Sequence, residues 1–323
     1  MSLRNTQYET IMRSYSRLQA KARREQEARL HQIYQQIPEL SDLEASITTL
    51  QGEKIRAAVH GHTEHKASVE ARLTALIARR QSLLSSHGYT REDLEPVYTC
   101  RDCRDTGDIG NSKCHCFRQA EINLLYHQSH LKDILARENF DTFSYSWYEG
   151  EDLQIMKRHV MDARLFIEHF DTDFQNLLLL GDVGTGKTFL SNCIAKELMD
   201  TGHSVVYLTA FQLFDLLSRA AFGSDRSKEA SDQGYPYIFD CDLLILDDLG
   251  TELPNSFTVS QFFLCINERI LRRKSTLISS NLDMEALRNI YSERTLSRII
   301  SSYTIRQLPG KDIRIKKKLL MNT

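Results

Sequence analysis

Hydrophobic residues follow two different patterns along the chain. Up to about residue 95 they recur at intervals of three and four positions, as at Tyr8, Ile11 and Tyr15. This spacing places them on one face of a helix and predicts long amphipathic helices. From about residue 150 onward, short hydrophobic runs alternate with stretches of helical spacing. Such alternation predicts strands separated by helices.

Individual residues indicate helix boundaries within the first 95 positions. Pro38 should end the first helix, and the sequence SDLE from Ser41 to Glu44 is typical of a capping box that begins the next. A turn is expected near Gly61, and Gly88 has the position of a helix C-cap. Periodicity leaves two interpretations open: a helical hairpin that packs on itself, or an arm that binds a partner protein.

The second pattern predicts a parallel sheet. The expected strands are residues 176–181, 204–209, 241–250 and 275–281, and the expected helices are residues 188–200, 210–222 and 258–273. Hydrophobic strands separated by helices indicate an α/β fold, in which a parallel sheet carries helices on both faces. Residues 223–234, with the sequence GSDRSKEASDQG, are the part of the chain most typical of a disordered loop.

Composition is that of a globular protein: 41% of the 323 residues are hydrophobic, 26% are charged, and the formal net charge is −2. This near-neutrality argues against a surface that is basic throughout, so contact with nucleic acid would need a local basic patch. The first residues lack the hydrophobic run of a signal peptide, and no segment has membrane-spanning length. We therefore expect a cytoplasmic protein with no membrane partner.

The sequence GDVGTGKT has the Walker A pattern G-x-x-x-x-G-K-[ST] between an expected strand and an expected helix, a context that a chance glycine-rich turn would lack. Its glycines allow a tight backbone wrap whose N–H groups face phosphate oxygens, beside the positive end of the helix. Lys187 would reach the β- and γ-phosphates of ATP, and the Thr188 hydroxyl would bind Mg²⁺. The residues expected to bind ATP here are Gly181, Asp182, Val183, Gly184, Thr185, Gly186, Lys187 and Thr188.

A second motif, LLILDDLG, ends an expected strand in Asp247 and Asp248. Two carboxylates after a buried strand are unfavourable unless a cation lies close by, and phosphate-bound Mg²⁺ would supply it. Asp247 would hold the metal through water, and Asp248 would polarise the attacking water. Because aspartate is shorter than the glutamate often used for that task, Glu252 is a second candidate. Asn281, after the next expected strand, would orient the water and sense the γ-phosphate, although asparagine is also common at turns.

In this order, the Walker A, Walker B and sensor-1 motifs resemble those of AAA+ ATPases. Residues 280–316, SNLDMEALRNIYSERTLSRIISSYTIRQLPGKDIRIK, are similar to the sensor-1, box VII and sensor-2 segment of bacterial helicase loaders of the DnaC/DnaI type. The sequences FDTFS at 140–144 and DTG at 105–107 look like the same family. The resemblance covers about residues 96–323.

The resemblance implies roles for particular arginines. The family's arginine finger falls on Arg298, with Arg294 as a rival, and its sensor-2 arginine falls on Arg314. Arg298 would act on the nucleotide of a neighbouring subunit, so the resemblance implies a homo-oligomer when ATP is bound. Residues 282–323, 42 in all, are too few for the helical lid of larger AAA+ proteins, which agrees with the reduced lid of this loader family.

Four of the seven cysteines, Cys100, Cys103, Cys114 and Cys116, have the spacing C-x₂-C-x₁₀-C-x-C. Two such pairs can close a tetrahedral thiolate site around Zn²⁺. A reducing compartment disfavours disulfides, and no βαβ unit surrounds the C-x-x-C pair, while an iron–sulfur cluster remains an alternative. His115 could replace one of the cysteines. A loop this short and polar has little core of its own, so we expect metal binding to fold it.

Together these features predict an ATP-dependent loader of the replicative hexameric helicase onto single-stranded DNA, with ATPase activity that depends on assembly or on DNA. The alternatives are an insertion-sequence-type transposition helper ATPase, and a nucleotide-binding adaptor with little hydrolysis. The expected regions are a helical helicase-interaction region at 1–95, a zinc module at 96–120, a linker at 121–150 and an AAA+ domain at 151–323. The basic residues that would either contact DNA or form a solvated tail are Arg306, Lys311, Arg314, Lys316, Lys317 and Lys318.

Overall fold

The computed structural model describes residues 5–59, 63–125, 130–222 and 235–321. The turn expected near Gly61 and the loop expected at 223–234 lie outside these described residues. Contacts within the chain divide it into two compact units, one of residues 12–112 and the other of residues 1–11 together with 113–323.

The unit of residues 12–112 is helical. Its elements are α1 (Asn5–Gln36), which begins before the unit, α2 (Pro38–Val59), α3 (Thr63–Ser86) and the 3₁₀ turn η1 (Glu92–Leu94). Pro38 ends the first helix as predicted, and it is also the first residue of α2. The predicted capping box is wrong, because Ser41 and Glu44 lie inside α2 and a proline with its φ already helical begins the helix instead. Glu44 forms an ion pair of 3.3 Å with Arg80 of α3.

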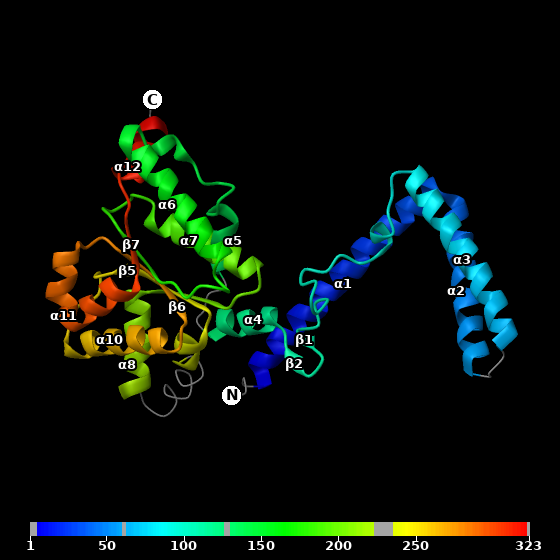
Figure 1. Cartoon of the computed structure of the whole chain (residues 1–323), viewed down its shortest axis with the longest axis horizontal. Coiled ribbons are helices and arrows are strands. Elements are labelled where there is room, and N and C mark those ends of the chain that lie inside the picture. The colour runs from blue at the N-terminus through cyan, green and yellow to red at the C-terminus, as the bar shows by residue number, and fades with distance from the viewer. Residues whose placement is uncertain (1–4, 60–62, 126–129, 223–234, 322–323) are drawn as a thin grey trace. The chain divides into compact units, whose positions relative to one another are not determined.

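Helices α2 and α3 run side by side as a hairpin (Figure 1). Their facing sides and the end of α1 share a hydrophobic core, whose buried members are Ile33, Ile37, Leu40, Leu43, Ile47, Leu50, Val69, Leu73 and Leu84. Gly88 caps α3 as predicted: its φ is +79°, and the N–H of Tyr89 donates to the Leu84 carbonyl over 2.9 Å. This left-handed cap satisfies carbonyl groups that the last helical turn leaves unpaired.

Five parallel strands form the sheet of the second unit, in the order β4–β5–β6–β3–β7. Their bounds are β3 (Leu177–Leu180), β4 (Val205–Thr209), β5 (Leu243–Leu249), β6 (Ser275–Ser280) and β7 (Thr304–Gln307). The first four are the predicted strands, and the predicted α/β class is confirmed. The pattern does not predict β7, because TIRQ is short and three of its four residues are polar, which an edge strand tolerates.

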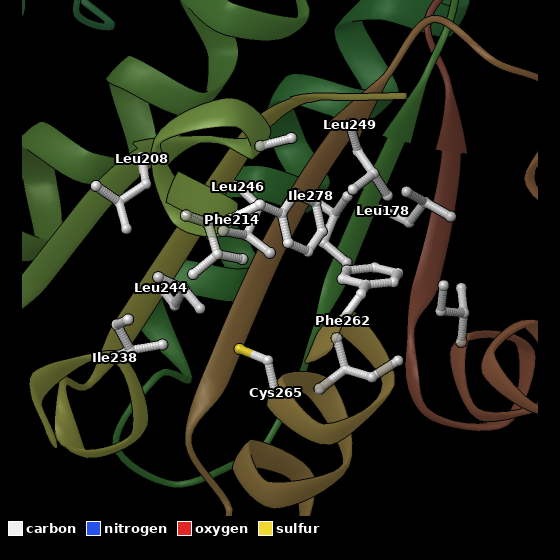
Figure 2. Close-up of a cluster of buried hydrophobic side chains, with 14 of the residues drawn as sticks. Leu178, Leu208, Phe214, Ile238, Leu244, Leu246, Leu249, Phe262, Cys265 and Ile278 are labelled. Atoms are coloured by element: carbon white, nitrogen blue, oxygen red, sulfur yellow. The ribbon is translucent and has the colours of Figure 1, made fainter. Parts of the chain in front are cut away.

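Helices cover both faces of this sheet (Figure 1). Their bounds are α4 (His115–Leu125), α5 (Leu131–Arg137), α6 (Gly150–Glu168), α7 (Lys187–Asp200), α8 (Ala210–Phe222), α10 (Ser256–Leu271), α11 (Met284–Ser302) and α12 (Ile313–Met321). Leu178 and Ile278 meet Phe214 of α8 and Phe262 of α10 in one core layer (Figure 2). Leu179 belongs to the other layer, with α5, α6 and α7. Because both faces are covered, β3 and most of β4 and β5 are continuous hydrophobic runs.

Residues 121–150, for which we predicted a linker, contribute to this second layer. Leu135 of α5, Phe140 and Tyr148 are buried in the same cluster as Val160 of α6. A solvent-exposed linker would leave these large hydrophobic side chains in water, which is unfavourable. The 3₁₀ turn η3 (Tyr145–Trp147) lies in this segment, whereas β1 (Asp108–Ile109) and β2 (Ser112–Lys113) precede it and pair as a separate two-stranded sheet.

A fully buried arginine closes the end of the sheet opposite the Walker motifs. Arg269 of α10 is 0% exposed, and its guanidinium donates to the carbonyls of Ile238, Cys241 and Ser275 over 2.6, 3.1 and 2.6 Å. Its Nε also donates to the Thr276 hydroxyl over 3.0 Å. The Cys241 and Ser275 carbonyls lie where β5 and β6 begin, and the Ile238 carbonyl lies in the helical segment before β5, so one side chain satisfies backbone groups of both segments.

We predict that Arg269→Ala destabilises the protein by about 3 kcal/mol or more, because each buried carbonyl left without a donor costs about 1 kcal/mol or more. Arg272→Ala is the matched control: Arg272 is exposed, and water screens its ion pairs with Asp240 and Glu268, so their loss should change the stability little. Urea unfolding of both variants measures the difference. Equal losses would contradict this role of Arg269.

Candidate functional site

The predicted phosphate-binding loop connects β3 to the first turn of α7. Its three glycines have positive φ, +150° at Gly181, +78° at Gly184 and +99° at Gly186. Their neighbours require glycine as well: a Cβ on Gly184 would overlap the Asp312 carboxylate, and one on Gly186 would lie 2.7 Å from the Tyr148 hydroxyl. The loop is therefore shaped both by its own backbone and by chain segments packed on it.

The amine of Lys187 lies inside this loop. It donates to the carbonyl oxygens of Gly181 and Asp182 over 2.7 and 2.9 Å. Burial lowers the pKa of the Lys187 amine, and the carboxylates of Asp248 and Asp247 partly oppose this. A buried ammonium whose contacts are carbonyl dipoles is an attractive partner for an anion such as a phosphate.

The carboxylate of Asp247 is 5% exposed and is held by hydroxyl groups from three elements. The hydroxyls of Thr188 in α7 and Tyr207 in β4 each donate to its Oδ2 over 3.0 Å. The hydroxyl of Ser279 in β6 donates to its Oδ1. Burial and this nearby carboxylate raise the pKa of Tyr207 well above its usual value, so its phenol remains a donor. A carboxylate beside the Thr188 hydroxyl is a ligand set that suits Mg²⁺.

Asp248 follows with a left-handed backbone, φ +57°. Its N–H donates to the Ser279 hydroxyl over 3.1 Å, so a single serine contacts both consecutive acids. Burial first, and then the charge of Asp247, raise the pKa of the Asp248 carboxyl. The left-handed conformation of a residue other than glycine is uncommon and is found most often at functional sites.

These motifs surround one cavity of about 660 Å³. The sequence-predicted residues that line it are Val183, Gly184, Gly186, Lys187, Thr188, Asp247, Asp248, Asn281 and Arg314. Arg314 comes from the first turn of α12, where its guanidinium lies 3.3 Å from the Asp312 carboxylate. Segments separated by more than 130 positions in the sequence thus meet around a space large enough for a nucleotide.

The predicted residues that do not line this cavity are Gly181, Asp182 and Thr185 of the loop, and Glu252 and Arg298. The buried carboxylate of Glu252 accepts the Gly250 N–H over 2.9 Å and the Tyr291 hydroxyl, so the structure does not support Glu252 as the residue that activates water. These contacts satisfy the acid within the core and leave Asp248 facing the cavity. Arg298 is exposed on α11 and, like its rival Arg294, does not line the cavity, so its assignment as an arginine finger stays a prediction.

The sequence reasoning missed several residues of the site. Glu138, Phe143, Trp147 and Tyr148 line the cavity from the segment between α5 and α6. The Tyr148 hydroxyl donates to the carbonyl of Thr185 over 2.9 Å and thereby holds the phosphate-binding loop. The available signal was the aromatic-rich sequence FDTFSYSWYEG, whose side chains are too large and too hydrophobic for an exposed connector.

The four predicted metal ligands form a cluster in the structure. The sulfurs of Cys100, Cys103, Cys114 and Cys116 all lie within 4.8 Å of one another. Tetrahedral zinc with Zn–S bonds of about 2.3 Å places its sulfurs about 3.8 Å apart, so these residues fit a closed four-thiolate site. The His115 ring instead lies against Gly202, 3.2 Å from where a Cβ would stand, and is not part of the cluster.

The fold and this cavity define the class: an α/β protein with a phosphate-binding loop at the carboxyl end of a parallel sheet. A family model narrows the class. The model of the family described as "IstB-like ATP binding protein" matches residues 119–320, and the chain belongs to this family. The resemblance to AAA+ ATPases of the IstB/DnaC type is thereby confirmed.

The individual curated relatives share only about a quarter of their residues with this chain in the matched region. The replicative helicase loader DnaC of Escherichia coli K12 is 26% identical over 137 residues, which are 42% of this chain and 55% of that protein. A protein of insertion sequence IS21 from Pseudomonas aeruginosa is 24% identical over 196 residues, 59% of this chain and 68% of that protein. The chain therefore spans about half the length of the DnaC protein that it matches.

Solved structures that resemble this chain have similarly low sequence identity. A crystal structure of the DnaC helicase loader has a TM-score of 0.46 at 20% identity and covers 55% of this chain and 99% of that one. The crystal structure of DnaI has a TM-score of 0.45 at 22% identity and covers 55% of this chain and 93% of that one. Among the described residues, none of the helices combines the length and the hydrophobicity needed to cross a bilayer.

We predict that Ser279→Ala weakens Mg²⁺-dependent nucleotide binding by about tenfold, because residues behind a metal ligand typically contribute that much to metal affinity. Ser280→Ala is the matched control: Ser280 is equally buried, but its hydroxyl donates to the Leu249 carbonyl and touches neither acid. Titration with a fluorescent ATP analogue, with Mg²⁺ and with EDTA, separates the two. An equal loss of magnesium dependence in both variants would refute the assignment.

We also predict that metal removal loosens the cysteine loop. Chelation with loss of the bound ion should increase amide hydrogen exchange within residues 100–116, above all around Cys114 and Cys116, because the thiolates lose the contact that joins them. Exchange in β3 and β5 should stay unchanged and serves as the internal control. Unchanged protection of the loop after complete metal removal would show that the metal does not fold it.

Proposed function

We propose that this protein is an ATP-dependent loader that places a replicative hexameric helicase on single-stranded DNA. The observation that carries the proposal is the single cavity lined by Lys187, Asp247, Asp248, Asn281 and Arg314, in a chain of the IstB-like ATP-binding family. The loader role draws support from the DnaC relative, whose name is replicative helicase loader, and from the cysteine cluster and helical hairpin that accompany the core.

Within the cavity, each group has a proposed task. Lys187 and the N–H groups of the glycine loop bind the β- and γ-phosphates, and Arg314 binds the γ-phosphate from α12. Thr188 and Asp247 hold Mg²⁺, which neutralises phosphate charge when bound. Asp248, whose raised pKa reflects a partly desolvated carboxyl, accepts the proton of the attacking water, and Asn281 orients that water.

Arg298 is proposed to complete the site of a neighbouring subunit. Its exposed position on α11, away from the cavity of its own chain, suits a group that acts across an interface. Head-to-tail interfaces of this kind generate rings or open helical assemblies. Hydrolysis would then depend on assembly, and ATP would act as a switch between subunits that are joined and subunits that are apart.

The other regions are proposed to contact partners. The four cysteines hold Zn²⁺ as a structural ion, and the α2–α3 hairpin offers a surface for the helicase, including Ile55, which is 66% exposed. Two of the basic residues considered for DNA contact already have partners within the protein. Arg306 pairs with Asp162 over 2.7 Å, and Lys316 donates to the Trp147 carbonyl over 3.0 Å. The phosphate contacts would therefore fall mainly to exposed side chains such as Lys311 and Lys318.

The second candidate is a transposition helper ATPase. One observation favours it: the IS21 relative matches 196 residues, a longer stretch than the 137 matched by DnaC. An adaptor that binds nucleotide but scarcely hydrolyses it is the third candidate. The helper function would not need the four-cysteine cluster, which disfavours it.

The decisive experiment is capture of a hexameric replicative helicase by the full-length chain, followed by transfer of that helicase to a single-stranded DNA circle. We expect transfer with ATP and its loss in Lys187→Ala, in which ATP turnover should fall by about a hundredfold or more. Lys196→Ala, on the same helix but half-buried and paired with Asp200, is the control. Binding to an insertion-sequence transposase instead would favour the helper function.

Mixing two inactive variants tests the shared site. Arg298→Ala keeps its own phosphate-binding loop, and Lys187→Ala keeps its own Arg298. If the arginine acts across the interface, an equal mixture should regain ATPase activity at about a quarter of its interfaces, the fraction that pairs an intact loop with an intact arginine. A mixture as inactive as either variant alone would place Arg298 outside the site.

A further inference from the structure

The turn after Cys103 has an uncommon backbone. Arg104 and Asp105 have φ of +53° and +55°, so two consecutive residues other than glycine are left-handed. The left-handed region costs most side chains about 1–2 kcal/mol, although aspartate tolerates it better than most. Gly107, with φ +82°, follows two positions later. A turn of this kind persists only where other contacts stabilise it.

The carboxylate of Asp105 supplies those contacts. It is 1% exposed, and each of its oxygens accepts one backbone N–H: Oδ2 from Thr99 over 2.9 Å, and Oδ1 from Cys100 over 2.7 Å. A buried carboxylate is costly unless hydrogen bonds replace its water, and charge-assisted bonds to N–H groups are among the strong ones. Asp105 thus joins the chain before the first cysteine pair to the chain after it.

The same turn also orients the second thiol of the pair. The Thr106 hydroxyl donates to the Cys103 carbonyl over 2.6 Å, and the N–H of Gly107 donates to the Cys103 sulfur over 3.3 Å. A hydrogen bond to a metal ligand orients that ligand, and such contacts typically contribute to metal affinity. Cys100 and Cys103 are therefore positioned by contacts that involve no metal.

We propose that Asp105 is a positioning residue for the metal centre: its buried carboxylate holds Cys100 and Cys103 in binding geometry before the ion arrives. Asp105 does not touch the ion in this scheme. The inference rests on the zinc site of the proposed function and deepens it, because it divides the loop into a preformed thiol pair and a second pair, Cys114 and Cys116, that closes when the metal binds.

Asp105→Asn isolates the effect. Asparagine has the same size and also tolerates the left-handed region, so the turn remains accessible. One of its two terminal atoms is an amide nitrogen, however, which would face the N–H of Thr99 or Cys100, donor against donor. The variant therefore loses one acceptor and the charge while it keeps the volume. Asp102→Asn, at an exposed position of the same loop, is the matched control.

The test measures the affinity of the full-length chain for Zn²⁺ alone by competition with a chromogenic chelator. We expect wild type to bind one ion, Asp105→Asn to bind it about tenfold or more weakly, and Asp102→Asn to stay within about twofold of wild type. Co²⁺ in place of Zn²⁺ gives a second readout, because the intensity of its absorption bands reports tetrahedral thiolate geometry, which Asp105→Asn should disturb. Nucleotide binding should be equal in all three and shows that the core is folded.

Two outcomes would overturn the inference separately from the proposed function. If wild type binds Zn²⁺ and Asp105→Asn binds it equally well, Asp105 has no positioning role, while the metal site and the loader function stand. If wild type binds no Zn²⁺, the metal site itself is wrong. Should Asp105→Asn fail to fold, hydrogen exchange of metal-free wild type still decides: the amides of Thr99 and Cys100 should be protected relative to their neighbours, and unprotected amides would refute a preformed pair.

Discussion

The buried carboxylate of Asp247 is the interaction on which the site depends. A carboxylate so far from water must accept hydrogen bonds, and in this protein the donors are hydroxyls of Thr188, Tyr207 and Ser279. These residues belong to α7, β4 and β6, so satisfying one acid fixes the phosphate-binding helix against two neighbours of β5. The parallel arrangement makes this possible, because the carboxyl ends of all the strands meet at the same edge.

Two other buried charges follow the same principle in different places. Arg269 satisfies carbonyl groups at the opposite end of the sheet, and Asp105 satisfies N–H groups beside the cysteines. In each case the partners are mainly backbone groups that the local chain leaves unpaired. A charged side chain can reach several such groups at once, which water would otherwise have to solvate.

The phosphate-binding loop also depends on segments that are remote in the sequence. Tyr148 donates to the Thr185 carbonyl, and the N–H of Ile313 donates to the Gly184 carbonyl over 3.0 Å. A nucleotide that displaces or tightens this loop would therefore also shift α12 and the segment before α6. This coupling gives a physical route by which the loop's position is transmitted to α12 and to the segment before α6, since packed interiors transmit shifts rather than absorb them.

The sequence by itself determined the local features: four strands, the helices between them, the break at Pro38, the glycine loop and the spacing of the cysteines. These depend on periodicity and on residue types over a few positions. Tertiary structure alone decided which side chains meet. It turned Glu252 toward Tyr291, brought Tyr207 and Ser279 to Asp247, and added β7 as an edge strand. Strand order and side-chain direction control these contacts. Both arise from packing between distant segments, so they cannot be predicted from any short stretch of sequence.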